Sequence, residues 1–116
     1  MKVKTMSVKD TDKIDGMGID EKTNTLVFLI TDPFTWVIQE YEHLKGLQTK
    51  INNYVGYIES KQYSELYSGR EFEQFRIEIV FRFQYTENCE KFLKAGKEQL
   101  KQHHIDITYT VTESEE

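Results

Sequence analysis

The segment FRIEIVFRFQY, residues 75–85, constrains the fold of this chain more than any other stretch. Aromatic and aliphatic side chains occupy every second position from Phe75 to Tyr85, and mostly polar side chains lie between them. Because successive side chains of a β-strand point to opposite faces of a sheet, this strand has one apolar face and one mostly polar face. It is predicted to belong to a sheet that is buried on one face and wet on the other.

The end of the chain repeats this pattern. Apolar residues alternate with Asp and Thr from Ile105 to Val111, which predicts another strand of the same kind. Between the two strands, Thr86 is a suitable N-cap for a helix. The residues that share one side of this predicted helix are Cys89, Phe92, Leu93, Leu100 and His103.

The first half of the chain predicts a hairpin followed by a long helix. KIDGMGID and TLVFLIT are the predicted strands, with turn residues between them, and Asp32 is the predicted N-cap, with Pro33 at the first helical position. Gly46 and Gly56 weaken this helix by about 1 kcal/mol each relative to Ala. Residues 61–74 predict a loop with one short helical turn at most. The apolar stripe of the long helix consists of Val37, Tyr41, Leu44, Leu47, Ile51, Tyr54, Val55 and Ile58.

The predicted order is therefore β-β-α-β-α-β, and the predicted fold class is α+β. Clean alternation in the last two strands favours a four-stranded, largely antiparallel sheet with both helices on one face. A strand, helix, strand segment needs a right-handed crossover if its strands are parallel. A chain of 116 residues is long enough for one core, so residues 12–112 are expected to form a single domain between a flexible N-terminal segment, 1–11, and an acidic tail, 113–116.

Charge and cysteine content narrow the function classes. The net charge of −5 and the absence of clustered Lys and Arg disfavour a nucleic-acid partner, and the aromatic residues of the 75–85 strand are expected on the face that helices cover. The longest apolar run, residues 26–30, is too short to span a membrane. A single cysteine cannot form an internal disulfide, which favours the cytoplasm.

The stretch DTDKIDGMGIDE, residues 10–21, invites comparison with a calcium-binding EF-hand loop. Asp10, Asp12 and Glu21 match positions 1, 3 and 12 of such a loop, but Ile14 replaces a ligand at position 5 and Asp15 replaces the glycine of the sharp turn. We therefore expect no metal and no cofactor. The strand interpretation instead predicts Ile14 and Ile19 in the core, a bulge or close backbone approach at Gly16 and Gly18, and acidic side chains at the surface.

No catalytic motif is evident. The three histidines lack zinc-site spacing, His103 and His104 are expected to close the second helix, and no P-loop, G-x-S-x-G or G-x-G-x-x-G occurs. A helix N-terminus lowers a thiol pKa, but the apolar neighbours of Cys89 favour a core position over a reactive one. A non-enzymatic protein is expected. The alternative is a small ligand-binding domain or enzyme with a pocket between sheet and helices, in which Asp15, Glu42 and His43 are the polar groups.

Several motifs resemble a small, uncharacterised bacterial domain family of unknown function. Its pattern is an Asp-x-Ile-Asp and Gly-Ile-Asp opening followed by a helix of the form Glu-His-Leu, Leu-Gln-x-Lys-Ile-Asn, Tyr, Ile-Glu-Ser. The resemblance implies a bacterial, cytosolic protein and no particular activity. The matching positions are Asp12, Ile14, Asp15, Gly18, Ile19, Asp20, Trp36, Glu42, His43, Leu44, Leu47, Gln48, Lys50, Ile51, Asn52, Tyr54, Ile58, Glu59 and Ser60.

The leading hypothesis is a small acidic protein-binding domain, such as an immunity or inhibitor protein that neutralises a bacterial toxin. Acidic clusters speed association with basic partners, so the expected partner is a basic protein such as a toxin domain. A homodimer built on the wet sheet face or on an edge strand is the other assembly considered, beside a monomer. The predicted partner-binding residues are Asp10, Asp12, Asp15, Asp20, Glu21, Arg76, Glu78 and Arg82.

Overall fold

A tight hairpin opens the part of the chain that the computed structural model describes, residues 14–112. Strand β1, Gly16–Asp20, pairs antiparallel with strand β2, Thr25–Asp32, so that Ile19 lies opposite Leu26. Asn24 adopts a positive φ of 53° in the turn, a conformation that Asn tolerates better than most residues. The predicted hairpin is confirmed. The predicted N-terminal segment and acidic tail lie outside the described residues.

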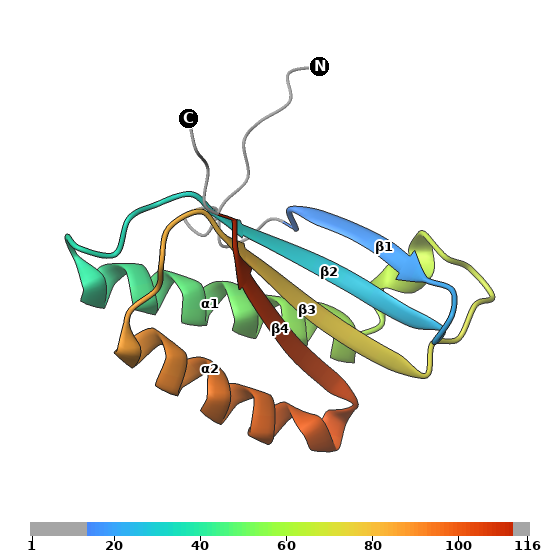
Figure 1. Cartoon of the computed structure of the whole chain (residues 1–116). Coiled ribbons are helices and arrows are strands. Elements are labelled where there is room, and N and C mark those ends of the chain that lie inside the picture. The colour runs from blue at the N-terminus through green and yellow to red at the C-terminus, as the bar shows by residue number, and fades with distance from the viewer. Residues whose placement is uncertain (1–13, 113–116) are drawn as a thin grey trace.

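The rest of the sheet corrects the predicted strand directions. Strand β3, Gln74–Phe81, pairs parallel with β2, and strand β4, Ile105–Val111, pairs parallel with β3, in the order β1-β2-β3-β4. The four-stranded α+β arrangement is confirmed, but only the β1–β2 pair of this mixed sheet is antiparallel. A helix connects β2 to β3 and another connects β3 to β4, and such crossovers make consecutive strands parallel (Figure 1).

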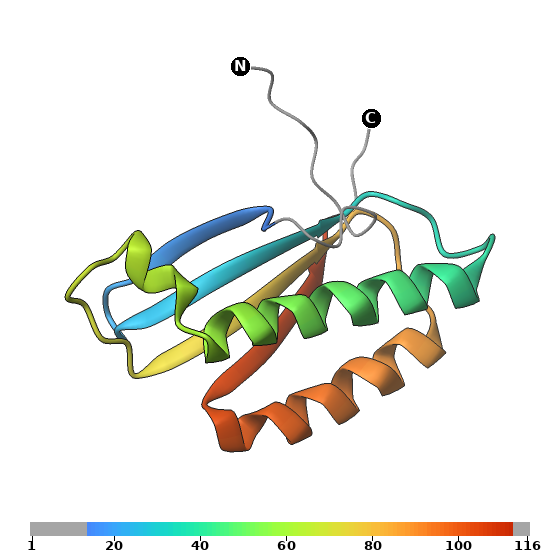
Figure 2. The ribbon, with the colours of Figure 1, turned by 180° about the vertical axis from the view of Figure 1, so that it is seen from behind.

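One layer of helices explains why alternation suggested antiparallel strands. The helices α1, Glu40–Glu59, and α2, Glu87–Leu100, cover the same face of the sheet, as the view from behind shows (Figure 2). Both crossovers proceed in one direction along the sheet, from β2 to β3 to β4, and a constant crossover hand then puts both helices on one side. The other face has no helical cover, so these parallel strands alternate as half-exposed antiparallel ones do.

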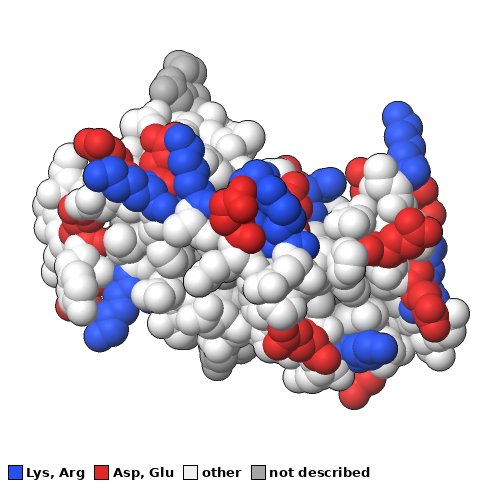
Figure 3. All heavy atoms as spheres, turned by 90° about the horizontal axis from the view of Figure 1, so that it is seen from below, with Lys and Arg blue, Asp and Glu red and all other residues white. Residues whose placement is uncertain are grey.

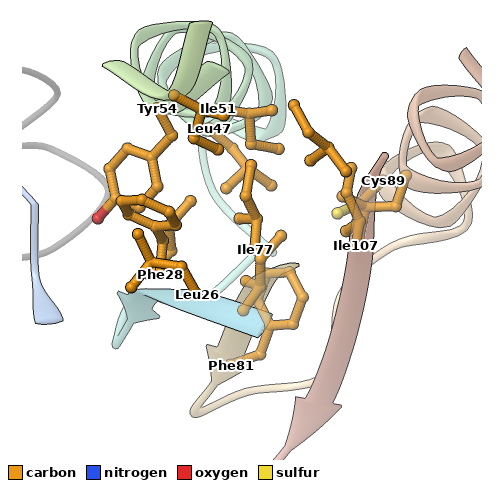
Figure 4. Packing of buried hydrophobic residues seen from close by; sticks show 14 of the residues in the cluster. Leu26, Phe28, Leu47, Ile51, Tyr54, Ile77, Phe81, Cys89 and Ile107 are labelled. Carbon is orange, nitrogen blue, oxygen red and sulfur yellow. The ribbon is translucent and has the colours of Figure 1, made fainter. Parts of the chain in front are cut away.

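The core fills the space between the helices and the covered face. Leu26, Phe28 and Ile77 project from the sheet toward Leu47 and Tyr54 of α1 (Figure 4). Ile14 and Ile19 pack against this core from the β1 side, as predicted. Fully burying an aliphatic or aromatic side chain stabilises a fold by about 1.5–3 kcal/mol, so these contacts are the main stabilising term of the described domain.

The start of α1 differs from the prediction. The helix begins at Glu40 and not at Pro33, and Asp32 is the last residue of β2. Residues 33–39 form a loop that ends at Gln39 in a left-handed conformation with φ 60°. Aromatic and β-branched residues dominate this loop, and they have low helix propensity. The buried side of α1 therefore starts at Leu47, and the predicted stripe is wrong for Val37 and Tyr41, which are exposed.

The elements after α1 agree more closely with the sequence pattern. A short 3-10 turn at Gln62–Glu65 is the single helical turn expected in residues 61–74. Thr86 caps α2 as predicted, since its side-chain oxygen accepts a hydrogen bond of 3.1 Å from the Cys89 backbone N–H. Strand β3 ends at Phe81, four residues earlier than the alternation suggested, although Tyr85 still packs on Phe81.

Two glycines give a stability test of this backbone. Gly56 lies on the exposed side of α1 with open space at its Cβ position, so Gly56→Ala is expected to raise the free energy of unfolding by about 0.5–1 kcal/mol. Gly69 has φ +78°, where an alanine side chain is strained, so Gly69→Ala is expected to lower it by about 1 kcal/mol. Urea unfolding of both variants measures the difference, and equal effects would contradict the assigned backbone conformations.

Candidate functional site

The loop between β2 and α1, residues 33–39, is held from beneath by a buried ion pair. The Nε2 atom of His43 lies 2.6 Å from Asp32 Oδ2 and 2.9 Å from Oδ1, and the Nδ1 atom lies 3.1 Å from the carbonyl oxygen of Thr35. A carbonyl and a carboxylate can only accept, so both ring nitrogens donate in this arrangement, which is the pattern of the imidazolium form. Asp32 Oδ1 also accepts the backbone N–H of Phe34, so the pair fixes both ends of the loop.

Trp36 covers this ion pair. Its ring stacks on the His43 ring with 3.6 Å between centroids and an angle of 12° between planes, and its edge contacts Phe81 of β3. Trp36 Nε1 is buried and lacks a hydrogen-bond partner among the described residues, a cost of about 1–3 kcal/mol. Stacking on the His43 ring and burial of the large indole offset that cost.

The pair of His43 and Asp32 has the composition of a catalytic dyad without its accessibility. The side chains of His43 and Asp32 are 6% and 0% exposed, and the acceptors already described occupy both ring nitrogens. A general base must reach the proton that it removes from a substrate. This pair is therefore a support for the loop and does not act as an acid–base centre in this conformation.

On its outer side the same loop displays apolar side chains. We call Val37, Ile38 and Tyr41 the loop patch, and their exposed fractions are 85%, 70% and 70%. Val37 and Ile38 follow the buried Trp36, so neighbouring residues of one short loop point into the core and into solvent. Val37 and Ile38 lie on the loop and Tyr41 lies in the first turn of α1. Single exposed apolar residues are ordinary, but three such residues within five positions are typical of a contact surface.

The charges near the loop patch are mostly acidic. Glu40 and Glu42 lie in the first turn of α1, and neither forms an ion pair within residues 14–112. Lys45 lies over the Tyr41 ring, with its Nζ 5.8 Å from the centroid. Elsewhere the two signs are interspersed: viewed from below, the molecule shows Lys and Arg beside Asp and Glu with no broad area of one sign (Figure 3).

The uncovered face of the sheet carries a shallow depression, which we call the sheet hollow. It has a volume of about 380 Å3 and lies over β1, β2 and β3. Gly18 of β1 leaves open space there, while the Leu29 side chain lies 3.3 Å from the Cβ position of Gly16. Its lining includes Gly16, Gly18, Val27, Leu29, Arg76 and Glu78.

A buried polar network joins β1 to α1. Lys50 is 0% exposed, and its Nζ lies 2.8 Å from Asp15 Oδ1. Asp15 Oδ2 accepts the backbone N–H of Thr31 at 2.8 Å, while the Tyr54 hydroxyl accepts the Asp15 N–H and donates to the carbonyl oxygen of Leu29. Burial raises the pKa of Tyr54 well above its ordinary value, so the hydroxyl remains a donor throughout the neutral range.

The predicted partner-binding residues do not form one surface. Asp10 and Asp12 lie outside the described residues, and Asp15, which was expected at the surface, is buried against Lys50 because a buried cation requires a countercharge. Asp20 lies 3.6 Å from Arg76, and both line the sheet hollow with Glu78. Glu21 pairs with Arg70 near the hairpin turn, and Arg82 lies beyond the end of β3 over the Phe83 ring.

The polar groups of the alternative enzyme hypothesis are also separated. His43 pairs with Asp32, Asp15 pairs with Lys50, and Glu42 is exposed. Cys89 is fully buried, and burial together with the negative charge of Asp32 raises its thiol pKa to about 12. Its burial confirms the prediction of a core cysteine. A thiol with such a raised pKa is protonated at neutral pH, and the thiolate is the reactive form.

The sequence pattern missed the two residues that organise these features. Asp32 was predicted as an N-cap, although its spacing of eleven residues from His43 gives no local signal of a pair. Lys50 was not singled out as a core residue, but its place between Leu47 and Ile51 on one side of the helix was a usable sign.

Residues 14–112 contain neither a group of metal ligands nor a helix that could cross a membrane. No three His, Cys, Asp or Glu side chains gather there as metal ligands. No helix in the same range has the length and apolar character to cross a membrane.

The Lys50 network gives a quantitative test. Lys50→Met removes the cation but leaves the Asp15 carboxylate buried, so we expect the free energy of unfolding to fall by about 3–5 kcal/mol. Adding Asp15→Asn removes the stranded charge, and the double variant should lose less than the two single losses combined. Urea unfolding of the two single variants and of the double variant provides the free energies for this comparison. Strict additivity, or a loss below about 1 kcal/mol for Lys50→Met, would contradict the described pair.

Comparison with known proteins places the chain in one family. A search of curated proteins and a search of solved structures each found no match. A family model described as a family of unknown function, DUF6572, matches residues 6–113. This match confirms the resemblance to a small domain family without an assigned activity. The chain therefore belongs to the DUF6572 family of unknown function.

Proposed function

We propose that this chain is a non-enzymatic protein-binding domain whose partner docks on the loop patch, Val37, Ile38 and Tyr41. The observation that carries the proposal is the exposure of these three apolar side chains, two on a loop that a buried ion pair holds in place and one in the first turn of α1. Leaving them in water costs free energy that burial would recover, at roughly 25 cal/mol for each Å2 of apolar area. A partner that covers the loop patch therefore gains affinity from apolar burial.

The anchoring beneath the loop favours the same conclusion. Binding normally costs about 0.5–1.5 kcal/mol for every flexible side chain that becomes ordered, and a preorganised loop lowers this cost. The stack of Trp36 on His43 and the four hydrogen bonds that Asp32 and Thr35 accept fix the backbone that carries the patch. Tyr41 also contributes a rigid aromatic side chain of the type that dominates binding energy at interfaces.

The acidic residues around the loop patch indicate which kind of partner it binds. Glu40 and Glu42 border the loop patch without basic neighbours in ion-pair contact among the described residues, and the whole chain has a net charge of −5. Such a border attracts a partner with basic groups around an apolar socket and speeds their association. A basic toxin neutralised by a bacterial, cytoplasmic inhibitor is the partner class that we favour.

The alternative of an enzyme or small-ligand domain has weaker support. It required Asp15, Glu42 and His43 around one pocket, and the first and last of these are buried in separate ion pairs.

Affinity capture from a lysate of the organism that encodes the chain tests the proposal. The double variant Val37→Ser/Ile38→Ser removes apolar area from the patch, and we expect at least a tenfold loss of the captured basic protein. The fold should be unaffected within about 0.5 kcal/mol, since both residues are exposed. Purified partner and variant, measured by calorimetry, give the change in affinity directly.

Leu66 supplies the matched control. It is 66% exposed on the connection that follows α1, at the opposite end of that helix from the patch, so Leu66→Ser removes a similar apolar side chain elsewhere. Capture that survives Leu66→Ser and fails in the double variant supports the proposal. Equal capture by the wild-type chain and the double variant, or a partner that is acidic, would overturn it.

A further inference from the structure

The sheet hollow is a second surface, apart from the loop patch, and charged side chains contribute to its lining. On the uncovered face, Gly16 of β1, Leu29 of β2 and Glu78 of β3 lie opposite one another in one cross-strand row. The next residue of that row is Thr108 of β4. Across the strands Glu78 is therefore flanked by an apolar and a neutral side chain, and along β3 its neighbour on the same face is Arg76. The Leu29 side chain lies 3.3 Å from the Cβ position of Gly16, whereas the Cβ position of Gly18 is open.

The adjacent row also begins with a glycine, but its charged side chains have countercharges. Gly18 lies opposite Val27, and Val27 lies opposite Arg76. Arg76 reaches toward Asp20, with 3.6 Å between their charged atoms, so its positive charge already has a countercharge. Asp106, which is next in this row, pairs with Lys97 at 2.6 Å.

Glu78 is the exception on this face. It has no ion pair and no side-chain hydrogen bond in the part of the chain that the structure describes, although it is half-buried. A half-buried carboxylate is partly desolvated and gains from a cation that approaches it. The floor beside it is formed by Val27 and Leu29, which offer apolar contact to an aliphatic chain.

We propose that the sheet hollow binds a lysine or arginine side chain from a protein segment that lies across the uncovered face. The aliphatic stem of that side chain packs on Val27 and Leu29 in the space left by Gly18, and its charged end pairs with Glu78. Long cationic side chains combine these two properties, an apolar stem and a charged head. The site lies on the face opposite the helices and is separate from the loop patch.

The shape of the hollow favours a side chain over a free amine. Pockets for small molecules bury most of the ligand surface, whereas this depression is shallow and open to solvent. A free amine would keep most of its contact with water, but a side chain delivered by a segment that covers the sheet would lose it. The backbone of the partner thus closes the site.

Model side chains test this site without an identified partner. The isotope-labelled full-length chain is titrated with N-acetyl-lysine methylamide, N-acetyl-arginine methylamide and the neutral N-acetyl-norleucine methylamide, and amide shifts are followed by NMR. We expect saturable shifts at residues 16–18, 27–29 and 76–78 with a cationic probe, at millimolar affinity, and at least fivefold weaker binding of the norleucine probe.

Three variants make the result specific. Glu78→Gln should weaken the cationic probes at least fivefold, while Glu98→Gln, an equal charge change on α2, should leave them unchanged. Gly18→Val should abolish binding by filling the hollow, and a Cβ at Gly18 meets no atom within 4 Å, so the strand accommodates it. If Gly18→Val does not fold, the comparison of Glu78→Gln with Glu98→Gln still decides.

Several outcomes would overturn the proposal. Equal binding of the norleucine and lysine probes would make the hollow a purely apolar site, and shifts located elsewhere would exclude it. Shifts at the hollow that grow with protein concentration in the absence of a probe would assign this face to a second copy of the chain. Because no partner is needed, failure here leaves the capture test of the loop patch unaffected.

Discussion

The buried contact between Lys50 and Asp15 ties together the parts of the domain that a two-layer fold would otherwise leave loosely connected. β1 is a short edge strand of five residues, and it hydrogen-bonds only to β2 within the described sheet. Lys50 and Tyr54 are one turn apart on α1. They bind Asp15, which leads into β1, and Tyr54 also binds the backbone of β2. A charge removed from water must be paired, so this network specifies where α1 lies along the sheet.

Once α1 is fixed, the exposed surfaces follow from topology. Both crossovers run in one direction, so the helices share one face and the other face of the sheet remains uncovered. The loop before α1 has to reach from the end of β2 to a helix that starts at Glu40. His43 and Trp36 fill the space beneath that loop, and Val37 and Ile38 remain outside. Both surfaces proposed for binding thus lie where the helices give no cover: the loop patch at the start of α1 and the sheet hollow on the other face of the sheet.

The sequence predicted local structure better than it predicted long-range pairing. The hairpin, the Thr86 cap, the short turn near Tyr63 and the core position of Cys89 depend on neighbouring residues, and all four are confirmed. Strand direction depends on the long connections between the strands, residues 33–73 and 82–104, and alternation reports only whether a face is covered. The start of α1 was wrong because Asp32 and Pro33 carry a local helix signal, while the actual partner of Asp32 is His43.

The candidate site was predicted only in part for the same reason. Arg76 and Glu78 were placed on one face of their strand by alternation, and they line the sheet hollow together with Asp20. Asp15 was misassigned to the surface because nothing in its neighbourhood indicates the cation that it meets, thirty-five residues away on α1. Val37 and Tyr41 of the loop patch were assigned to the apolar stripe of the helix, since apolar residues at helical spacing predict a buried side even before the helix begins.

The loop patch as the docking surface is tested most directly by hydrogen–deuterium exchange on the purified complex of this chain with its captured partner. We expect amides of residues 33–43 to exchange more slowly in the complex than in the free chain, because a bound protein shields the loop and the first turn of α1. Unchanged exchange in that segment, with protection confined to residues 61–72 around Leu66, would contradict docking on Val37, Ile38 and Tyr41.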